Sequence, residues 1–341
     1  MSDDEIRDLF VPLWLDFRGA DCFPNARPLL AHYTSVRVLE SILQTNGVWF
    51  SHPLLMSDPK ELKFGLVTGA QLFFNSERMR AACGSQARFD RLRGTFNAWF
   101  KTFWEEHLPN TFMVCFCEHA PDDYDGVLSM WREYADRGNG VAVVIDTGRI
   151  IPREDSFFIV SKICYSSPDE LKIRIDELLG RCADIIANNV IPDDKLVVCS
   201  FFIFQRLKTL AMFTKHRGYR EENEWRIVYM RDMGESEMLN HMIGSSIVNG
   251  QAVPKLKLKI AAFAGLPETA NLGLSELVER ILLGPASSQL AAAGCAKTAR
   301  SAWLSGAEGS PPSFGDTVPG IKSRGLAIGE GLWPNKVFNY T

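Results

Sequence analysis

Two acidic residues, Glu222 and Glu224, stand two positions apart in the stretch REENEWRIVY, at the start of an apolar run. In a β-strand they share one face with Arg226. Two carboxylates at this spacing repel each other unless a cation, a metal or a substrate lies between them. One interpretation is an edge strand on which Arg226 and the nearby Lys215 or Arg217 pair the acids. The other is a carboxylate pair directed into a cleft, for general-base or charge-stabilising chemistry.

A second group of candidate residues is the sequence HYTS, which runs from His32 through Tyr33 and Thr34 to Ser35. It lies where a predicted strand gives way to a predicted amphipathic helix. A histidine at a strand end, followed by hydroxyl groups at a helix N-terminus, offers several donors to a polar ligand. The structural alternative is a helix N-cap at Thr34 or Ser35 beside a partly buried histidine, with Gly47 ending the helix.

A third group, in the sequence LSMWREY, places Met130, Trp131 and Tyr134 at helical spacing. Such a stripe is typical of core packing. An aromatic ring that also lines a cleft can stack on a planar ligand. Both interpretations stay open for Trp131 and Tyr134.

Carboxylates elsewhere allow a metal-dependent alternative. Asp58 and Glu61 in SDPKEL are explained by the N-terminus of a helix with Pro59 at its first position. Together with Glu222 and Glu224, and with Lys215 nearby, they also suit a magnesium-dependent nuclease or hydrolase.

A zinc site is not expected from the cysteines. Cys115, Cys117 and His119 would share one face of a strand, but the wider spacing and the second ligand pair of a structural zinc site are absent. The remaining cysteines lie mostly in apolar stretches, so we expect buried thiols rather than disulfides. No bound metal is predicted.

The elements that must position these groups alternate between strand and helix. Apolar runs of strand length are RPLLAHYTS, VWFSHP, TFMVCFCEH, VAVVID, EWRIVYM, KLKLKI and VERILLGP. The run VAVVID is continuous, which predicts a central strand buried on both faces. Residues about 67–108, with a break near Gly84, and about 168–215 are predicted to be helical insertions. A short helix is expected from Ser129.

These elements predict a mixed α/β chain of the α+β class. We expect an N-terminal helical extension at 1–27, a single α+β catalytic-like domain at 28–305, and a Gly/Pro/Ser-rich tail at 306–341. No internal repeat or dividing linker is found.

Composition excludes some classes of function. The chain has 341 residues and a formal net charge of -4, which argues against general affinity for nucleic-acid backbones or anionic membranes. The acidic start gives no sign of a secretory signal, and no apolar run approaches the ~18 residues of a membrane span. We therefore expect a soluble cytoplasmic protein. Gly-rich nucleotide fingerprints, a G-x-S-x-G elbow and an H-E-x-x-H motif are also absent.

The blocks HYTS, SILQTNG, SDPKE, SMWREY, GVAVVID, EENEWRI and ILLGP occur in an order that resembles a bacterial family of uncharacterised proteins. The resemblance covers about residues 28–286. Because that family has no agreed function, it implies a common fold but no activity.

The order of a histidine on an early strand, an aromatic residue in the middle and a glutamate on a late strand is similar to ADP-ribosyltransferases of the His-Tyr-Glu type. This resemblance implies two crossed sheets with helical insertions and NAD in the cleft between them. It implies that His32 binds the adenine-side ribose and that Tyr134, or else Tyr33 or Trp131, stacks on nicotinamide. Glu224 would hold the nicotinamide ribose and stabilise the oxocarbenium charge, while Glu222 activates the acceptor.

The leading hypothesis is therefore an ADP-ribosyltransferase or NAD glycohydrolase with NAD as substrate. Glu224 and Glu222 form its catalytic pair, and its NAD-contacting residues are His32, Tyr33, Thr34, Ser35, Trp131, Tyr134 and Arg226. The acceptor is unknown, and a role as a toxin or phage-defence effector with an antitoxin or other partner protein is a further hypothesis. The alternatives are the metal-dependent enzyme and a non-catalytic interaction module anchored by Trp49 and Trp333.

Overall fold

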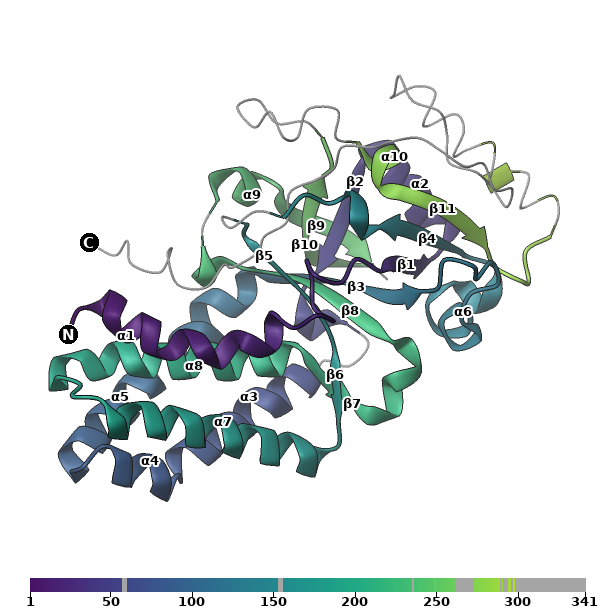
Figure 1. Ribbon diagram of the computed structural model, residues 1–341. Helices are drawn as coiled ribbons and strands as arrows, with labels where there is room; N and C mark the ends of the chain where they lie inside the picture. Colours follow the sequence, from purple (N-terminus) through teal and green to yellow (C-terminus); the bar gives the residue numbers. More distant parts are fainter. Residues whose placement is uncertain are drawn as a thin grey trace.

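The computed structural model describes residues 1–56, 60–152, 156–234, 236–248, 250–261 and 273–288, with residues 290, 294, 295 and 297. The expected cap at Asp58 and Pro59, and the expected tail at 306–341, lie outside the described residues. The described chain is of mixed α and β class, as predicted. Most of its helices lie together on one side of a large antiparallel sheet and form what we call the helical half (Figure 1).

The large sheet has nine strands and divides into two wings at β3 (Thr111–His119). One edge of β3 pairs with β8 over most of its length. The other edge pairs with β1 from Leu29 and His119 to Ala31 and Cys117, and with β2 at Ser51 and Met113. The first wing continues from β1 to β4 and β11, and the second from β2 to β10 and β9.

The strands of this sheet are β1 (Leu29–Thr34), β2 (Gly47–Ser51), β4 (Val141–Asp146), β5 (Phe158–Lys162), β8 (Glu224–Met230), β9 (Ile243–Val248), β10 (Gln251–Lys259) and β11 (Val278–Leu283). A second, two-stranded sheet pairs β6 (Cys164–Ser166) with β7 (Thr214–His216) in parallel.

Two strand predictions can be judged directly. The run VAVVID is β4, which lies between β1 and β11 and has its first five residues buried, as predicted. The run EWRIVYM is β8, but the edge-strand interpretation is wrong. This strand pairs with both β3 and β5, and all seven of its residues are buried.

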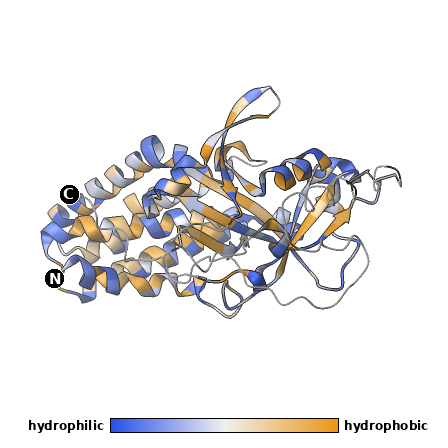
Figure 2. Cartoon of the chain, turned by 90° about the horizontal axis from the view of Figure 1, so that it is seen from above, coloured by the Kyte–Doolittle hydropathy of each residue, from blue (hydrophilic) through white to orange (hydrophobic). Residues whose placement is uncertain are grey.

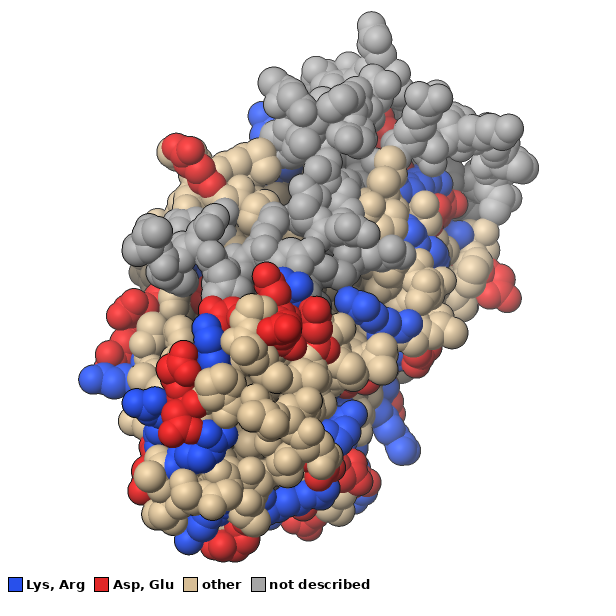
Figure 3. All heavy atoms as spheres, turned by 60° about the vertical axis from the view of Figure 1, so that its left-hand side comes forward, with Lys and Arg blue, Asp and Glu red and all other residues tan. Residues whose placement is uncertain are grey.

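The two predicted insertions, at about 67–108 and 168–215, are helical and supply most of the helices of the helical half. The helix α8 lies at its centre, with every residue but one buried. Figure 2 shows apolar residues on the facing sides of these helices, and Figure 3 shows Lys and Arg interspersed with Asp and Glu on the outer surface. The helices are α3 (Lys60–Phe74), α4 (Glu77–Ala82), α5 (Gln86–Thr102), α7 (Pro168–Asn188) and α8 (Leu196–Met212).

The N-terminal segment is helical, as expected, and packs into the same core. It contains α1 (Asp3–Phe10) and a 3-10 helix (Val11–Phe17). The ring of Phe10 stacks on Phe202 of α8 with a centroid distance of 5.6 Å. The segment therefore completes the packing around α8.

Four further helices contact strands of the large sheet. They are α2 (Val36–Thr45), α6 (Leu128–Tyr134), α9 (Glu237–His241) and α10 (Leu274–Leu277). The predicted end of α2 needs correction, because the left-handed residue is Asn46, with φ 47° and ψ 47°, and Gly47 already begins β2. Asn46 also accepts a hydrogen bond from Leu274 N at 3.0 Å. A Cβ on Gly47 would lie 2.7 Å from Leu258 O, so glycine is needed there for the approach of β10.

Candidate functional site

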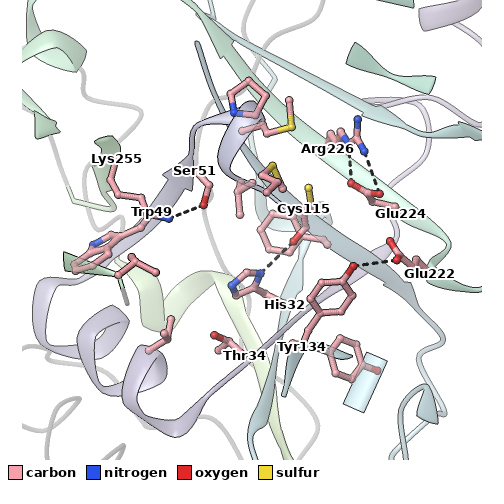
Figure 4. A pocket seen from close by; sticks show the side chains of 18 of the residues that line it. His32, Thr34, Trp49, Ser51, Cys115, Tyr134, Glu222, Glu224, Arg226 and Lys255 are labelled. Atoms are coloured by element: carbon pink, nitrogen blue, oxygen red, sulfur yellow. Dashed lines mark hydrogen bonds and ion pairs between the residues drawn. The ribbon is translucent and has the colours of Figure 1, made fainter. Parts of the chain in front are cut away.

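A cavity of about 490 Å³ opens where the two wings of the sheet separate. Its walls come from β1, β2 and β3, from the first turns of α2, from the β9–β10 hairpin and from α6. His32, Tyr134, Glu222 and Glu224, which are distant in sequence, all line it (Figure 4). The split of the sheet thus creates the cleft, and its polar groups come from strands (His32 and Glu224), from α6 (Tyr134) and from the 3-10 helix before β8 (Glu222).

The two glutamates do not lie on one strand face, as the spacing predicted. Glu222 is the last residue of a 3-10 helix (Arg217–Glu222), Asn223 is left-handed with φ 39°, and the strand begins at Glu224. Both carboxylates nevertheless converge on one cation. Lys215 Nζ donates to Glu224 Oε2 at 2.9 Å and also to Glu222.

Arg226 completes a buried ion network. Its Nε donates to Glu224 Oε1 at 2.7 Å, and its Nη2 lies 3.0 Å from Glu61 Oε2. Its Nη1 donates to Met212 O at 2.6 Å. The predicted pairing of the acids by Lys215 and Arg226 is therefore confirmed, whereas Arg217 lies beside Glu170, at 3.8 Å.

The charges in this network depend on one another. Burial alone would raise the pKa of Glu224, but Arg226 and Lys215 outweigh it and lower that pKa to about 2. In return, Glu224 and Glu222 raise the pKa of Lys215, and Glu224 raises the pKa of Arg226, in both cases against the effect of burial. Glu61 differs, since burial raises its pKa despite Arg226, and its Oε1 has no hydrogen-bond partner among the described residues. Glu224, Lys215 and Arg226 are therefore charged at neutral pH.

Neighbours that the sequence did not point to also support Glu224. Its backbone N–H donates to Tyr165 Oη at 2.8 Å. Cys115 lies opposite Arg226 in the β3–β8 register. Burial, and then the charge of Glu224, raises the pKa of the Cys115 thiol well above its usual value. Since Tyr165 approaches from a different sheet, no sequence pattern marks it as a neighbour of Glu224.

Tyr134 and His32 occupy the middle of the pocket (Figure 4). Tyr134 Oη donates to Glu222 Oε1 at 3.0 Å. His32 Nδ1 donates to Cys115 O at 3.1 Å, because a carbonyl oxygen can only accept. Burial lowers the pKa of His32, and the charge of Lys255 lowers it further, against the effect of that hydrogen bond. His32 is therefore neutral at pH 7, with Nε2 as an acceptor.

The remaining predicted NAD contacts divide into two groups. Thr34 lines the pocket, and so does part of Tyr33. However, the ring of Tyr33 packs edge-on against Trp131, and its Oη accepts from Val127 N at 2.9 Å. Burial raises the pKa of Tyr33 to about 12.

Trp131 and Ser35 do not line the pocket. Trp131 is a buried residue of α6, and its Nε1 donates to Asp125 O at 2.7 Å. Ser35 Oγ caps α2 by accepting from Val38 N at 3.2 Å. The core interpretation fits Trp131, and the N-cap interpretation fits Ser35.

A second cavity, of about 390 Å³, lies on the other side of the ion network. It is lined from α3, from the end of α8 and from the start of α7. Glu61 and Lys215 line both cavities. The network thus forms a partition between them.

The geometry bears on both alternative functions, the metal-dependent enzyme and the interaction module. Of the four acids proposed for a metal, Asp58 lies outside the described residues, and the other three contact Lys215 or Arg226. Within the described ranges, no group of three or more His, Cys, Asp or Glu side chains is placed to hold a metal ion. Of the proposed interaction anchors, Trp333 lies outside the described residues. Trp49 lines the pocket, with Lys257 Nζ 4.9 Å from the ring centroid.

All eight cysteines are free thiols, as predicted; six of them are buried, whereas Cys115 and Cys164 are only half-buried. His119, the third member of the Cys115, Cys117 and His119 group, contacts Asp123 O through its Nε2 at 2.9 Å. None of the described helices is both long and apolar enough to cross a membrane.

Residues 130–227 match the sequence model of the family described as "Protein of unknown function (DUF2971)". This segment is therefore similar to the DUF2971 family. It runs from α6 to β8 and contains Tyr134, Lys215, Glu222, Glu224 and Arg226, whereas His32 and Glu61 precede it. The expected resemblance to an uncharacterised family is confirmed for this part of the chain.

Searches of curated proteins and of solved structures found no match to the chain. Nothing in these comparisons links the DUF2971 domain to ADP-ribosyltransferases.

Proposed function

We propose that this protein cleaves the bond between nicotinamide and ribose in NAD, as an ADP-ribosyltransferase or an NAD glycohydrolase. One observation carries the proposal. A pocket between two wings of a split antiparallel sheet gathers His32 from an early strand, Tyr134 from the middle of the chain and the pair Glu222 and Glu224 beside a late strand. This is the order that the resemblance to His-Tyr-Glu enzymes implies. The cavity volume lies in the range of small-molecule sites, ~300–1,000 Å³.

The carboxylates of the pocket suit the positive charge that forms when NAD is cleaved. When the glycosidic bond breaks, its electron pair leaves with nicotinamide, and positive charge develops on the ribose. A preorganised carboxylate stabilises that charge without rearrangement. Glu222 and Glu224 lie on the wall of the pocket, and Glu224 is ionised throughout the neutral range because its pKa is lowered to about 2.

The two carboxylates have different surroundings, which suggests different roles. The Glu224 side chain is 3% exposed, and both its oxygens are bound by Arg226 or Lys215. The Glu222 side chain is 12% exposed and lies beside Tyr134. In our proposal Glu222 contacts the reacting ribose and accepts the proton of the attacking water or acceptor hydroxyl. Glu224 holds Lys215 and Arg226 in place and contributes its negative charge.

His32 and Tyr134 would hold the rest of the substrate. The neutral Nε2 of His32 is an acceptor suited to a ribose hydroxyl. The ring of Tyr134, which is held by its hydrogen bond to Glu222, would stack on nicotinamide. Such an activity would suit a toxin or phage-defence effector in the cytoplasm, because loss of NAD stops growth.

The test is NAD consumption by the purified protein with cell lysate as a source of acceptors. We compare wild type with Glu222→Gln, and with Glu221→Gln as a matched control, since Glu221 is an exposed neighbour that does not line the pocket. We expect nicotinamide release by wild type and the control, and a loss of about a hundredfold or more in Glu222→Gln. No release by wild type, together with no NAD-induced rise in melting temperature, would refute the proposal.

A further inference from the structure

At the end of the pocket away from the glutamates, one lysine has no acidic partner. Lys255 stands on β10 and lines the pocket, and its Nζ donates to Ser51 Oγ at 2.7 Å. Within the described part of the chain, no carboxylate pairs with it. Burial lowers its pKa, and no neighbouring acid opposes that effect. A partly buried ammonium group without a counter-ion is unfavourable, and an anionic ligand would relieve it.

A second cation without an acidic partner among the described residues lines the same pocket. Arg37, on the first turn of α2, also lines the cavity and makes no ion pair with any described residue. Lys215 and Arg226, by contrast, are bound by carboxylates at the other end. The pocket is therefore polarised, with Lys255 at one end and the acidic network of Glu222 and Glu224 at the other (Figure 4).

We propose that Lys255, Arg37 and Ser51 form a subsite for the diphosphate of a nucleoside diphosphate or of a dinucleotide. Ser51 accepts a hydrogen bond from Lys255, so its own proton is available to a phosphate oxygen. Lys255 and Arg37 come from different elements, β10 and α2, and so offer charge to two phosphoryl groups. The identity of the complete ligand rests on the proposed function, but anion binding at Lys255 does not.

The subsite also fixes the direction of the ligand. Figure 4 shows Trp49, Lys255 and Ser51 on one side of His32, and Tyr134 and Glu222 on the other. A diphosphate at Lys255 places one nucleoside beside the aromatic ring of Trp49, which suits a base. The other nucleoside then reaches past His32 to the carboxylates. This arrangement assigns the reacting ribose to Glu222 and the adenosine half to the β2–β10 wing.

The test measures equilibrium binding of ADP and of adenosine by calorimetry, without any turnover. The variants are Lys255→Met and Arg37→Gln. The control is Lys259→Met, on the same strand but exposed and not lining the pocket. We expect ADP to bind at least tenfold more tightly than adenosine to wild type. Lys255→Met should weaken ADP binding by about tenfold or more, the usual effect of losing one charge-assisted hydrogen bond, and leave adenosine binding unchanged. Arg37→Gln should give a smaller loss, and Lys259→Met none.

Equal affinities of wild type for ADP and adenosine would overturn the subsite, and so would full ADP affinity in Lys255→Met. A melting temperature of Lys255→Met at or above that of wild type checks that the fold is intact. If Lys255→Met does not fold, Arg37→Gln decides alone, because its exposed position does not bear on stability. Lys255-dependent ADP binding without NAD cleavage would support the subsite while refuting the proposed function.

Discussion

Replacing Glu224 by glutamine tests the buried ion network most directly. Glu224 is 2% exposed and separates two cations, Arg226 and Lys215, which are themselves 5% exposed. The substitution keeps the shape of the side chain but removes its charge, so both cations lose their closest acidic partner. We expect a large loss of stability, in contrast to the small effect typical of an exposed glutamate.

The magnitude follows from the pKa. A carboxyl group whose pKa falls from 4.5 to about 2 on folding contributes about 3 kcal/mol to the free energy of unfolding at neutral pH. Removing one partner of a buried ion pair costs ~3–5 kcal/mol by comparison with other proteins. Both arguments give about 3 kcal/mol for Glu224→Gln at pH 7.

The stability difference between wild type and Glu224→Gln should depend on pH. Because the folded-state pKa is lowered, the contribution is complete above about pH 4.5 and is lost as the pH falls toward 2. Below about pH 4.5 the carboxyl group of Glu224 takes up a proton in the unfolded chain while it stays ionised in the folded protein, so the unfolded state of wild type is stabilised. The difference between wild type and Glu224→Gln should therefore be constant from pH 7 to 5 and shrink below that range.

The assay is denaturant unfolding followed by tryptophan fluorescence from pH 7 to 3.5. Glu221→Gln, three positions away and exposed, is the control and should change the free energy of unfolding by less than about 0.5 kcal/mol. A cost below about 1 kcal/mol for Glu224→Gln, or a cost that does not vary with pH, would show that the network is not formed as described. Glu224→Gln is thus a test of stability, and Glu222→Gln is the better test of catalysis.

Two further predictions separate the residues of the pocket from their structural neighbours. Tyr134→Phe removes the hydrogen bond to Glu222 but keeps the ring. We expect NAD cleavage to fall about tenfold while stability changes by about 1 kcal/mol or less; unchanged turnover would remove Tyr134 from the site. Ser35→Ala removes the cap of α2 and should cost about 1 kcal/mol in thermal unfolding with NAD cleavage per folded molecule unchanged. A selective loss of turnover would instead give Ser35 a role in binding.

The sequence predicted the elements of the site better than their contacts. Apolar runs located β4 and β8, and the N-cap pattern located α2. The edge position assumed for β8 was wrong because local alternation does not report which strands pair on each side. The pairing of β8 with β3 and β5 joins segments that are far apart along the chain.

The spacing in the sequence identified Glu222 and Glu224 as a pair, but the predicted cause of their proximity, a shared strand face, is wrong. A strand was expected to hold Glu222 and Glu224 on one face, whereas the left-handed Asn223 separates a 3-10 turn from the strand. Lys215 brings the two acids together from β7, the short strand that follows α8. The convergence is therefore tertiary, and the spacing alone would not have distinguished it from two solvated acids.

The ion network also explains why the helical half matters to the pocket. Lys215 follows α8, Glu61 belongs to α3, and Arg226 lies on the sheet. Each contributes one ionisable side chain to the partition between the two cavities, so the packing of the helices sets the position of the carboxylates. Buried ion pairs of this kind are a poor source of stability, because well-packed apolar residues serve as well or better. A fold that keeps three acids and two cations where its halves meet violates that preference, and such violations are expected at sites that function requires.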